Sequence, residues 1–143
     1  MKSIIIALFL LAAGSTMCFA QCDKKVSITS SKSEQLDDSG QVQGTRDEKT
    51  TVDISTTDVN VSIVGDDGDQ KLTGKVKSKT CDWKTPYKEG KTVVTTTLND
   101  GGNDKDFTIT IEGMDGKVTL VAESPQMPGR KIRLVVDKFE EKI

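Results

Sequence analysis

Apolar and polar residues alternate along most of the chain after the first twenty residues. Val59, Val61 and Ile63 are separated by polar residues, and the same period of two recurs at 107–111 and 132–136. Successive side chains of a strand point to opposite faces, so this pattern predicts sheets with one buried and one solvated face. No segment of helical length has apolar residues at the 3.6-residue spacing of an amphipathic helix.

Segments rich in Gly, Asn, Asp and Pro separate the alternating runs, for example at 37–40, 65–70 and 124–129. These residues favour turns because they supply positive φ or end a strand. The sequence therefore predicts eight strands, near residues 24–36, 42–55, 58–64, 71–80, 91–98, 106–112, 117–123 and 130–138.

Most of the predicted links have hairpin length, which places consecutive strands side by side. The predicted fold is all-β: an antiparallel up-and-down meander of about eight strands, closed or nearly closed into a barrel, because closure removes bare edge strands. A two-sheet sandwich is the alternative. The residues predicted to face the core are nearly all aliphatic: Val26, Ile28, Leu36, Val52, Ile54, Val59, Val61, Ile63, Leu72, Val76, Val94, Leu98, Phe107, Ile109, Ile111, Val118, Leu120, Ile132, Leu134 and Val136.

Residues 1–20 have the features of a secretory signal peptide: Lys2, an unbroken apolar run over 4–13 and small residues before Gln21. We expect cleavage near Ala20/Gln21 and export to the periplasm or the extracellular medium. The apolar run is about half the length of a transmembrane helix, so we expect no membrane insertion. Residues 21–143 then have the length of a single all-β domain.

Cleavage would leave two cysteines, Cys22 and Cys81. Because exported proteins meet an oxidising environment, we expect a disulfide bond between them. It would close a loop of about 60 residues, which the chain-entropy model values at roughly 4 kcal/mol.

An exported chain of this size, with eight predicted strands in a meander and one disulfide, resembles the lipocalin-like barrels. The resemblance covers the mature chain and concerns its architecture, because the Gly-x-Trp motif of lipocalins proper is not on the first predicted strand. Trp83 instead follows Cys81 and Asp82 in mid-chain. The resemblance implies ligand capture inside the barrel or at its mouth.

The composition argues against several kinds of chemistry. The sequence has no histidine, which excludes Ser-His-Asp and Cys-His catalysis and the usual zinc sites. It also lacks the nucleophile-elbow, dinucleotide-binding and Walker A motifs. The formal net charge is −2 with both signs interspersed, so no basic stripe offers a surface to nucleic acid. We therefore expect a protein that is not an enzyme, uses no cofactor and binds no nucleic acid.

The register of the first hairpin can be predicted from its apolar residues. If paired residues have numbers that sum to 78, Leu36 lies opposite Val42 and Val26 lies opposite Val52, and all four share one face. A shift by one residue would destroy both matches.

In that register the same face also carries charged residues: Lys32 opposite Arg46, Glu34 opposite Gly44, and Glu48 opposite Ser30. Burying these charges unpaired would cost several kcal/mol. Either the hairpin projects beyond the sheet and is solvated, or Lys32, Glu34, Arg46 and Glu48 form a polar barrel mouth that orients a ligand. We favour the solvated hairpin and keep the four residues as ligand-binding candidates.

The only Trp and the only Tyr lie in the stretch SKTCDWKTPYKEGKT, residues 78–92. We expect a link of about ten residues here, which a disulfide would hold against the N-terminus with Trp83 covering one end of the core. Alternatively, Trp83 and Tyr87 form an exposed contact patch, since both rings are common interface anchors. They complete the set of ligand-binding candidates.

Acidic turns at 66–69 and 99–106 contain oxygen ligands suited to calcium, but their spacing does not match the calcium-binding loop, so we predict no metal site. The leading functional hypothesis is an exported, non-enzymatic β-barrel that binds a small ligand or an envelope partner. The alternatives are an inhibitor or interaction module that acts through its loops without an internal cavity, and a calcium-dependent structural protein.

Overall fold

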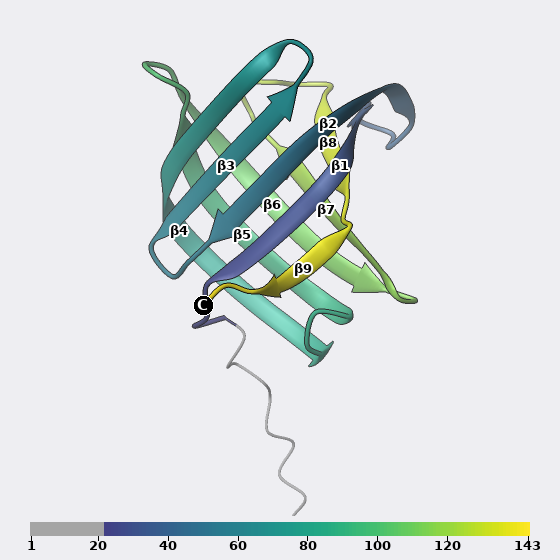
Figure 1. The fold of residues 1–143 in the computed structure, drawn as a ribbon, viewed down its shortest axis with the longest axis vertical. Coiled ribbons are helices and arrows are strands. Elements are labelled where there is room, and N and C mark those ends of the chain that lie inside the picture. Colours follow the sequence, from purple (N-terminus) through teal and green to yellow (C-terminus); the bar gives the residue numbers. More distant parts are fainter. Residues whose placement is uncertain (1–21) are drawn as a thin grey trace, which may run out of the picture.

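Short turns between alternating segments produce an antiparallel β-barrel in the computed structural model, which describes residues 22–143 (Figure 1). The predicted signal peptide and its cleavage site lie outside these residues. No helix long and apolar enough to cross a membrane occurs in the described part of the chain. The strands are β1 Val26–Leu36, β2 Val42–Ile54, β3 Asp58–Gly65, β4 Gly68–Thr85, β5 Glu89–Asn99, β6 Asp104–Met114, β7 Lys117–Glu123, β8 Lys131–Val135 and β9 Lys138–Glu141.

Consecutive strands from β1 to β8 are hydrogen-bonded neighbours, and β1 also pairs with β8, which closes the barrel. The predicted all-β meander and its closure are therefore confirmed, and the structure is not a sandwich. The prediction of one final strand over 130–138 is wrong, because the chain leaves β8 after Val135 and resumes as β9 beside the first half of β1 (Figure 1).

Branched aliphatic side chains fill the barrel, as the alternation predicted. All of the predicted inward residues except Leu36 and Ile63 belong to one hydrophobic cluster, and Leu36 is buried outside it. The residues that join the cluster without having been predicted are Cys81, Trp83, Tyr87, Ala122 and Phe139. Several of the buried positions on the inner wall are polar, among them Ser30, Thr50, Thr92 and Thr96.

Strand β4 is longer than predicted. It continues to Thr85 and pairs with β5 almost to the turn, so Cys81 and Trp83 are strand residues and not part of a ten-residue link. An extra residue in β4 between Val76 and Ser78 interrupts the ladder as a β-bulge. Such a bulge changes which residues of the strand face inward.

The predicted single register of the first hairpin is wrong beyond its turn. Leu36 does pair with Val42, but two shifts in β1–β2 place Val26 opposite Ile54 and not Val52. Because the two shifts add up to two residues, the apolar residues at the far end still face inward. The alternation therefore predicted the buried face correctly while the pairing was wrong.

Candidate functional site

The barrel wall is interrupted where β8 gives way to β9. The backbone N–H of Val136 donates to the carbonyl of Val118 at 3.2 Å, whereas that of Asp137 donates to Thr29 at 2.8 Å. The chain thus crosses from β7 to β1 within two residues. Since β9 pairs only with β1 among the described strands, its second edge is left open beside β7.

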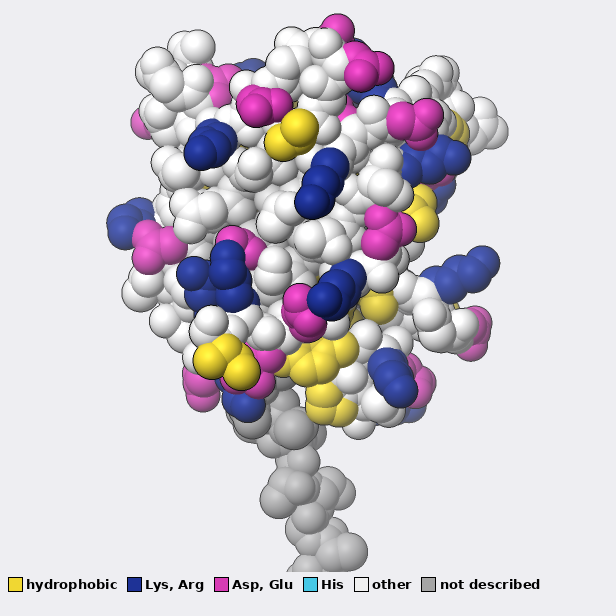
Figure 2. All heavy atoms as spheres, viewed as in Figure 1, with side chains coloured by type: hydrophobic (Ala, Val, Ile, Leu, Met, Phe, Trp, Pro, Cys, Tyr) yellow, Lys and Arg dark blue, Asp and Glu magenta, His cyan; other side chains and the backbone are white. Residues whose placement is uncertain are grey.

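A groove of about 650 Å³ lies at this interruption, and we call it the side groove. Apolar side chains of Tyr87, Val118, Val135, Val136 and Phe139 line it. The remaining lining comes from the turn before β7 and from charged side chains: Glu34, Gly116, Lys117, Thr119, Arg133 and Asp137. Hydrophobic surface is visible at this lower end of the molecule, near the β4–β5 hairpin (Figure 2).

Tyr87 packs against Phe139 in the side groove and has an unusual backbone conformation. Its ring meets that of Phe139 edge to face, with centroids 4.9 Å apart and planes at 83°. Its φ of 62° lies in the left-handed region, which costs a non-glycine residue of order 1–3 kcal/mol. Burial raises the pKa of its hydroxyl, the carboxylate of Glu141 raises it further, and Lys24 opposes both.

The charges of the side groove are mostly paired. Arg133 donates to Oε2 of Glu34 from Nε at 2.7 Å and from Nη2 at 2.6 Å. Asp137 accepts the backbone N–H of Ser31 at 2.7 Å. Lys117 has no hydrogen-bond or ion-pair partner among the described residues, so it contributes a free positive charge to the rim.

A second, smaller hollow lies beside the β1–β2 hairpin and shares Glu34 with the side groove, and we call it the mouth pocket. It has a volume of about 270 Å³. Ser33 donates from Oγ to Oε1 of Glu48 at 2.5 Å, and Arg46 lies opposite Ser33 in the ladder. The other lining residues are Glu34, Gln35, Gly44, Thr45, Arg130 and Ile132.

The predicted charged cluster is split between the two faces of the wall. Lys32 pairs with Asp47, not with Arg46, and Glu34 pairs with Thr45, not with Gly44. The β1–β2 register shift brings Ser33 inward, so the residues on either side of it, Lys32 and Glu34, point outward. The predicted shared face for all four residues is therefore wrong.

Glu34, Arg46 and Glu48 nevertheless all line the mouth pocket, which therefore contains three of the four candidate residues. Glu48 does not lie opposite Ser30, because Ser30 pairs with Thr50, and Glu48 falls in the interrupted part of the β1–β2 ladder, where it has no pairing partner on β1. Glu34 reaches the side groove through Arg133. Lys32 lines neither hollow.

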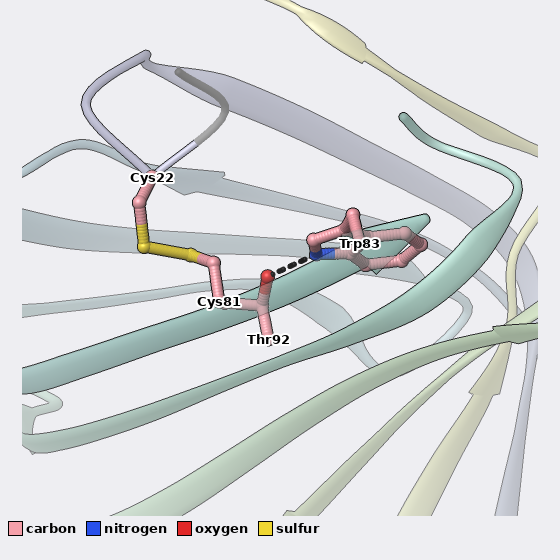
Figure 3. The surroundings of a disulfide bond; sticks show 4 residues. All are labelled: Cys22, Cys81, Trp83 and Thr92. Atoms are coloured by element: carbon pink, nitrogen blue, oxygen red, sulfur yellow. Dashed lines mark hydrogen bonds between the residues drawn. A yellow bond between two sulfur atoms is a disulfide. The ribbon is translucent and has the colours of Figure 1, made fainter. Parts of the chain in front are cut away.

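Trp83 and the Cys22–Cys81 disulfide lie near one another on the last part of β4 (Figure 3). The predicted Cys22–Cys81 bond is present, with Cα atoms 5.8 Å apart. Trp83 is 5% exposed. Its Nε1 donates to Oγ1 of Thr92 at 2.7 Å, and its ring centroid is 5.6 Å from that of Phe139. Trp83 therefore belongs to the core and not to an exposed patch.

Sequence reasoning missed Arg133, Lys117 and Phe139 as parts of the side groove. Arg133 and Lys117 sit at ordinary solvent-facing positions of the alternating pattern, so no local signal marked them. Phe139 was missed because a single last strand was predicted over 130–138, whereas Phe139 lies on a separate strand, β9. A break after Val136 would have been suggested only by Asp137, since Asp is disfavoured inside strands.

The described residues offer no group of three or more His, Cys, Asp or Glu placed to hold a metal ion. Asp66, Asp67 and Asp69 line an open hollow of about 620 Å³ that also contains Arg46 and Glu48. The acidic turn thus lies beside a guanidinium group.

No family model, no curated protein and no solved structure matches this chain. The closed antiparallel barrel is consistent with the lipocalin-like architecture, and the fold is the extent of that likeness.

Proposed function

We propose that this protein is exported and binds, without catalysing a reaction, a small amphipathic molecule in the side groove. The observation that carries the proposal is a groove of about 650 Å³ lined by apolar side chains and a few charged groups. Small-molecule sites typically have volumes of about 300–1,000 Å³ and this same combination of linings.

The filled interior supports a site on the outside of the barrel. Ile28, Ile54, Ile111, Val59 and Val94 are fully buried and occupy the centre. A ligand inside the barrel would have to displace packed side chains, and core substitutions of that size typically cost several kcal/mol. The side groove requires no such displacement.

The lining supports a ligand with an apolar body and one anionic group. Tyr87 and Phe139 offer ring faces and edges to an aromatic or aliphatic body. Glu34 already neutralises Arg133, so Lys117 is the rim cation left to pair with a carboxylate, sulfonate or phosphate.

Export is supported by the disulfide, because cysteines are kept reduced in most intracellular compartments. The absence of histidine from the sequence supports a binding role over catalysis.

Titration with 8-anilinonaphthalene-1-sulfonate, an anionic aromatic fluorophore, tests the proposal. Val135 lines the groove and is 42% exposed, so Val135→Trp fills the groove and should weaken probe binding at least tenfold. Val64→Trp is the matched control, because Val64 is 46% exposed on β3 and lies outside the groove. Lys117→Met should weaken binding several-fold by removing the cation.

Equal binding by the two tryptophan variants, or no binding by the parent protein, contradicts the proposal. Thermal melts of all variants confirm that the fold is kept. The specific alternative is a loop-mediated interaction through 124–129, where Pro125, Gln126 and Pro128 are exposed. A partner that is captured equally by the parent and by Val135→Trp, but not after replacement of that loop, would favour this alternative.

A further inference from the structure

The β4 bulge turns a lysine toward the barrel interior. Before the bulge, Leu72 and Val76 face inward, and uninterrupted alternation would point Lys79 outward. The extra residue reverses the phase, so Lys79 lies opposite Val94, which is fully buried. Lys79 thus shares the inner face with Trp83 at the lower end of the barrel.

The Lys79 amine has no partner within the described part of the chain. Its Nζ is shut off from solvent and makes no hydrogen bond. The preceding lysines of the strand behave differently: Lys75 and Lys77 are exposed and form ion pairs with Asp58 and Asp106. A charged ammonium would leave three N–H donors here without acceptors. A neutral amine has only two N–H groups to satisfy, carries no charge and keeps a free lone pair.

Burial lowers the pKa of the Lys79 amine, and the nearby carboxylate of Asp23 opposes this only in part. Burial therefore raises the fraction of neutral amine at Lys79 above that of an exposed lysine, and the neutral amine is the nucleophilic form.

A pocket of about 460 Å³ adjoins this amine, and we call it the disulfide pocket. The residues that line it are Cys22, Asp23, Thr56, Val76, Lys77, Ser78, Lys79 and Cys81. The Cys22–Cys81 bond (Figure 3) ties the first described residues to β4, so Cys22 and Asp23 line the same pocket as Lys79. The pocket has room for a small molecule, and the amine nitrogen beside it is itself buried.

We propose that Lys79 is a carbonyl-reactive amine that holds a small aldehyde or ketone covalently in the disulfide pocket. The Nζ lone pair attacks the carbonyl carbon to give a carbinolamine. Loss of the carbonyl oxygen together with the two amine hydrogens as one water molecule gives the imine. Asp23 is placed to take and return the proton during these steps. No oxidant or reductant is needed.

Reductive trapping measures this reactivity on the intact, disulfide-bonded protein. The protein is treated with propanal and sodium cyanoborohydride at pH 7.4, and the initial alkylation rate of each lysine is read by peptide mass spectrometry. Lys79 should react several-fold faster than Lys75 and Lys77, because its lowered pKa raises the fraction of neutral amine. A rate at Lys79 equal to or below theirs overturns the proposal.

Variants distinguish the reactivity of the Lys79 amine from the access of carbonyl compounds to the disulfide pocket. Lys79→Arg should abolish the fast phase of alkylation. Lys75→Arg is the matched control and should leave it unchanged, because Lys75 is an exposed lysine of the same strand that does not line the pocket. Joint replacement of Cys22 and Cys81 by Ser admits water and should reduce the advantage of Lys79. Alkylation of Lys79 only in that double variant would instead show that the native pocket is closed to carbonyl compounds, and would overturn the proposal.

Discussion

Two parts of the barrel wall differ in regularity. Strands β5, β6 and β7 pair without a register shift between β5 and β6 or between β6 and β7. The β1–β2 ladder has two shifts and the β4–β5 ladder also has two. In the regular part, alternation predicted the inward apolar residues correctly, whereas in the interrupted part it predicted faces and partners less well.

The interruptions bring polar side chains to the inner wall. Ser33 turns inward after the shift in β1 and meets Glu48. Lys79 turns inward after the bulge in β4. Because a bulge reverses the phase of every residue beyond it, polar residues take positions that strict alternation would give to apolar ones. In this barrel, candidate chemistry gathers where the pairing is irregular.

Single-residue deletions should give the largest difference between the two parts. Deletion of Thr110 from β6 would turn Ile111 and the strand beyond it to the wrong face, so the domain should not fold at 25 °C. Deletion of Lys77 removes the bulged residue and keeps both flanking registers, so that variant should fold with reduced stability. Circular dichroism and thermal melts distinguish them. Similar losses from both deletions would contradict the comparison.

Truncation of Trp83 should lower the free energy of unfolding at least as much as truncation of a core residue in the regular wall. Trp83→Ala removes a buried ring and should lower the free energy of unfolding by about 3–5 kcal/mol, and Ile111→Ala by about 2–5 kcal/mol. Urea titration measures both. Lys84 is an exposed neighbour of Trp83 on β4, so Lys84→Ala should change the free energy of unfolding by less than about 0.5 kcal/mol. A loss at Trp83 no larger than at Lys84 would mean that the ring is not part of the core.

Replacement by alanine should affect stability differently at two strand glycines, because the space around them differs. A Cβ at Gly74 would overlap the carbonyl of Thr97 on β5, so Gly74→Ala should cost about 1–3 kcal/mol. A Cβ at Gly44 would meet nothing within 4 Å, so Gly44→Ala should be near neutral. Urea titration provides the test, and an equal cost at both positions would mean that close approach of the strands does not require Gly74.

The smallest expected effect concerns Asp106. Hydrogen bonds from Lys77, Thr97 and Gln126, together with the charge of Lys77, lower its pKa to about 2. A carboxylate with a lowered pKa stabilises the fold above its unfolded pKa, and this contribution disappears as the pH falls toward the folded value. Asp106→Asn should therefore lower the melting temperature at pH 7, with the difference from the parent vanishing near pH 2.

Asp115→Asn is the control for that experiment, because Asp115 lies in the exposed β6–β7 turn at a φ of 53°, which Asn also tolerates. Its melting temperature should follow that of the parent at every pH. A constant difference between Asp106→Asn and the parent from pH 7 to pH 2 would argue that the ionisation of Asp106 plays no part.

The sequence predicted some of the residues of the candidate site but not how they are brought together. Arg46 with Glu48, and Tyr87 as a contact residue, were predicted and do line hollows. The partnership of Glu34 with Arg133 was not predicted, because the two residues are 99 positions apart and meet only through the closure of β1 on β8. The inward turn of Lys79 was not predicted either, since a bulge leaves no mark in the alternation of a strand as polar as β4.

The sequence by itself determined the all-β class, the number of hairpins, the buried face of each regular strand and the pair of cysteines available to bond. These follow from local rules, because the period of two and the turn residues act over a few positions. Only the tertiary structure decided the bulges, the break between β8 and β9, and therefore which polar groups share a hollow. Those features depend on how eight twisted strands close on one another, and that is a property of the whole sheet.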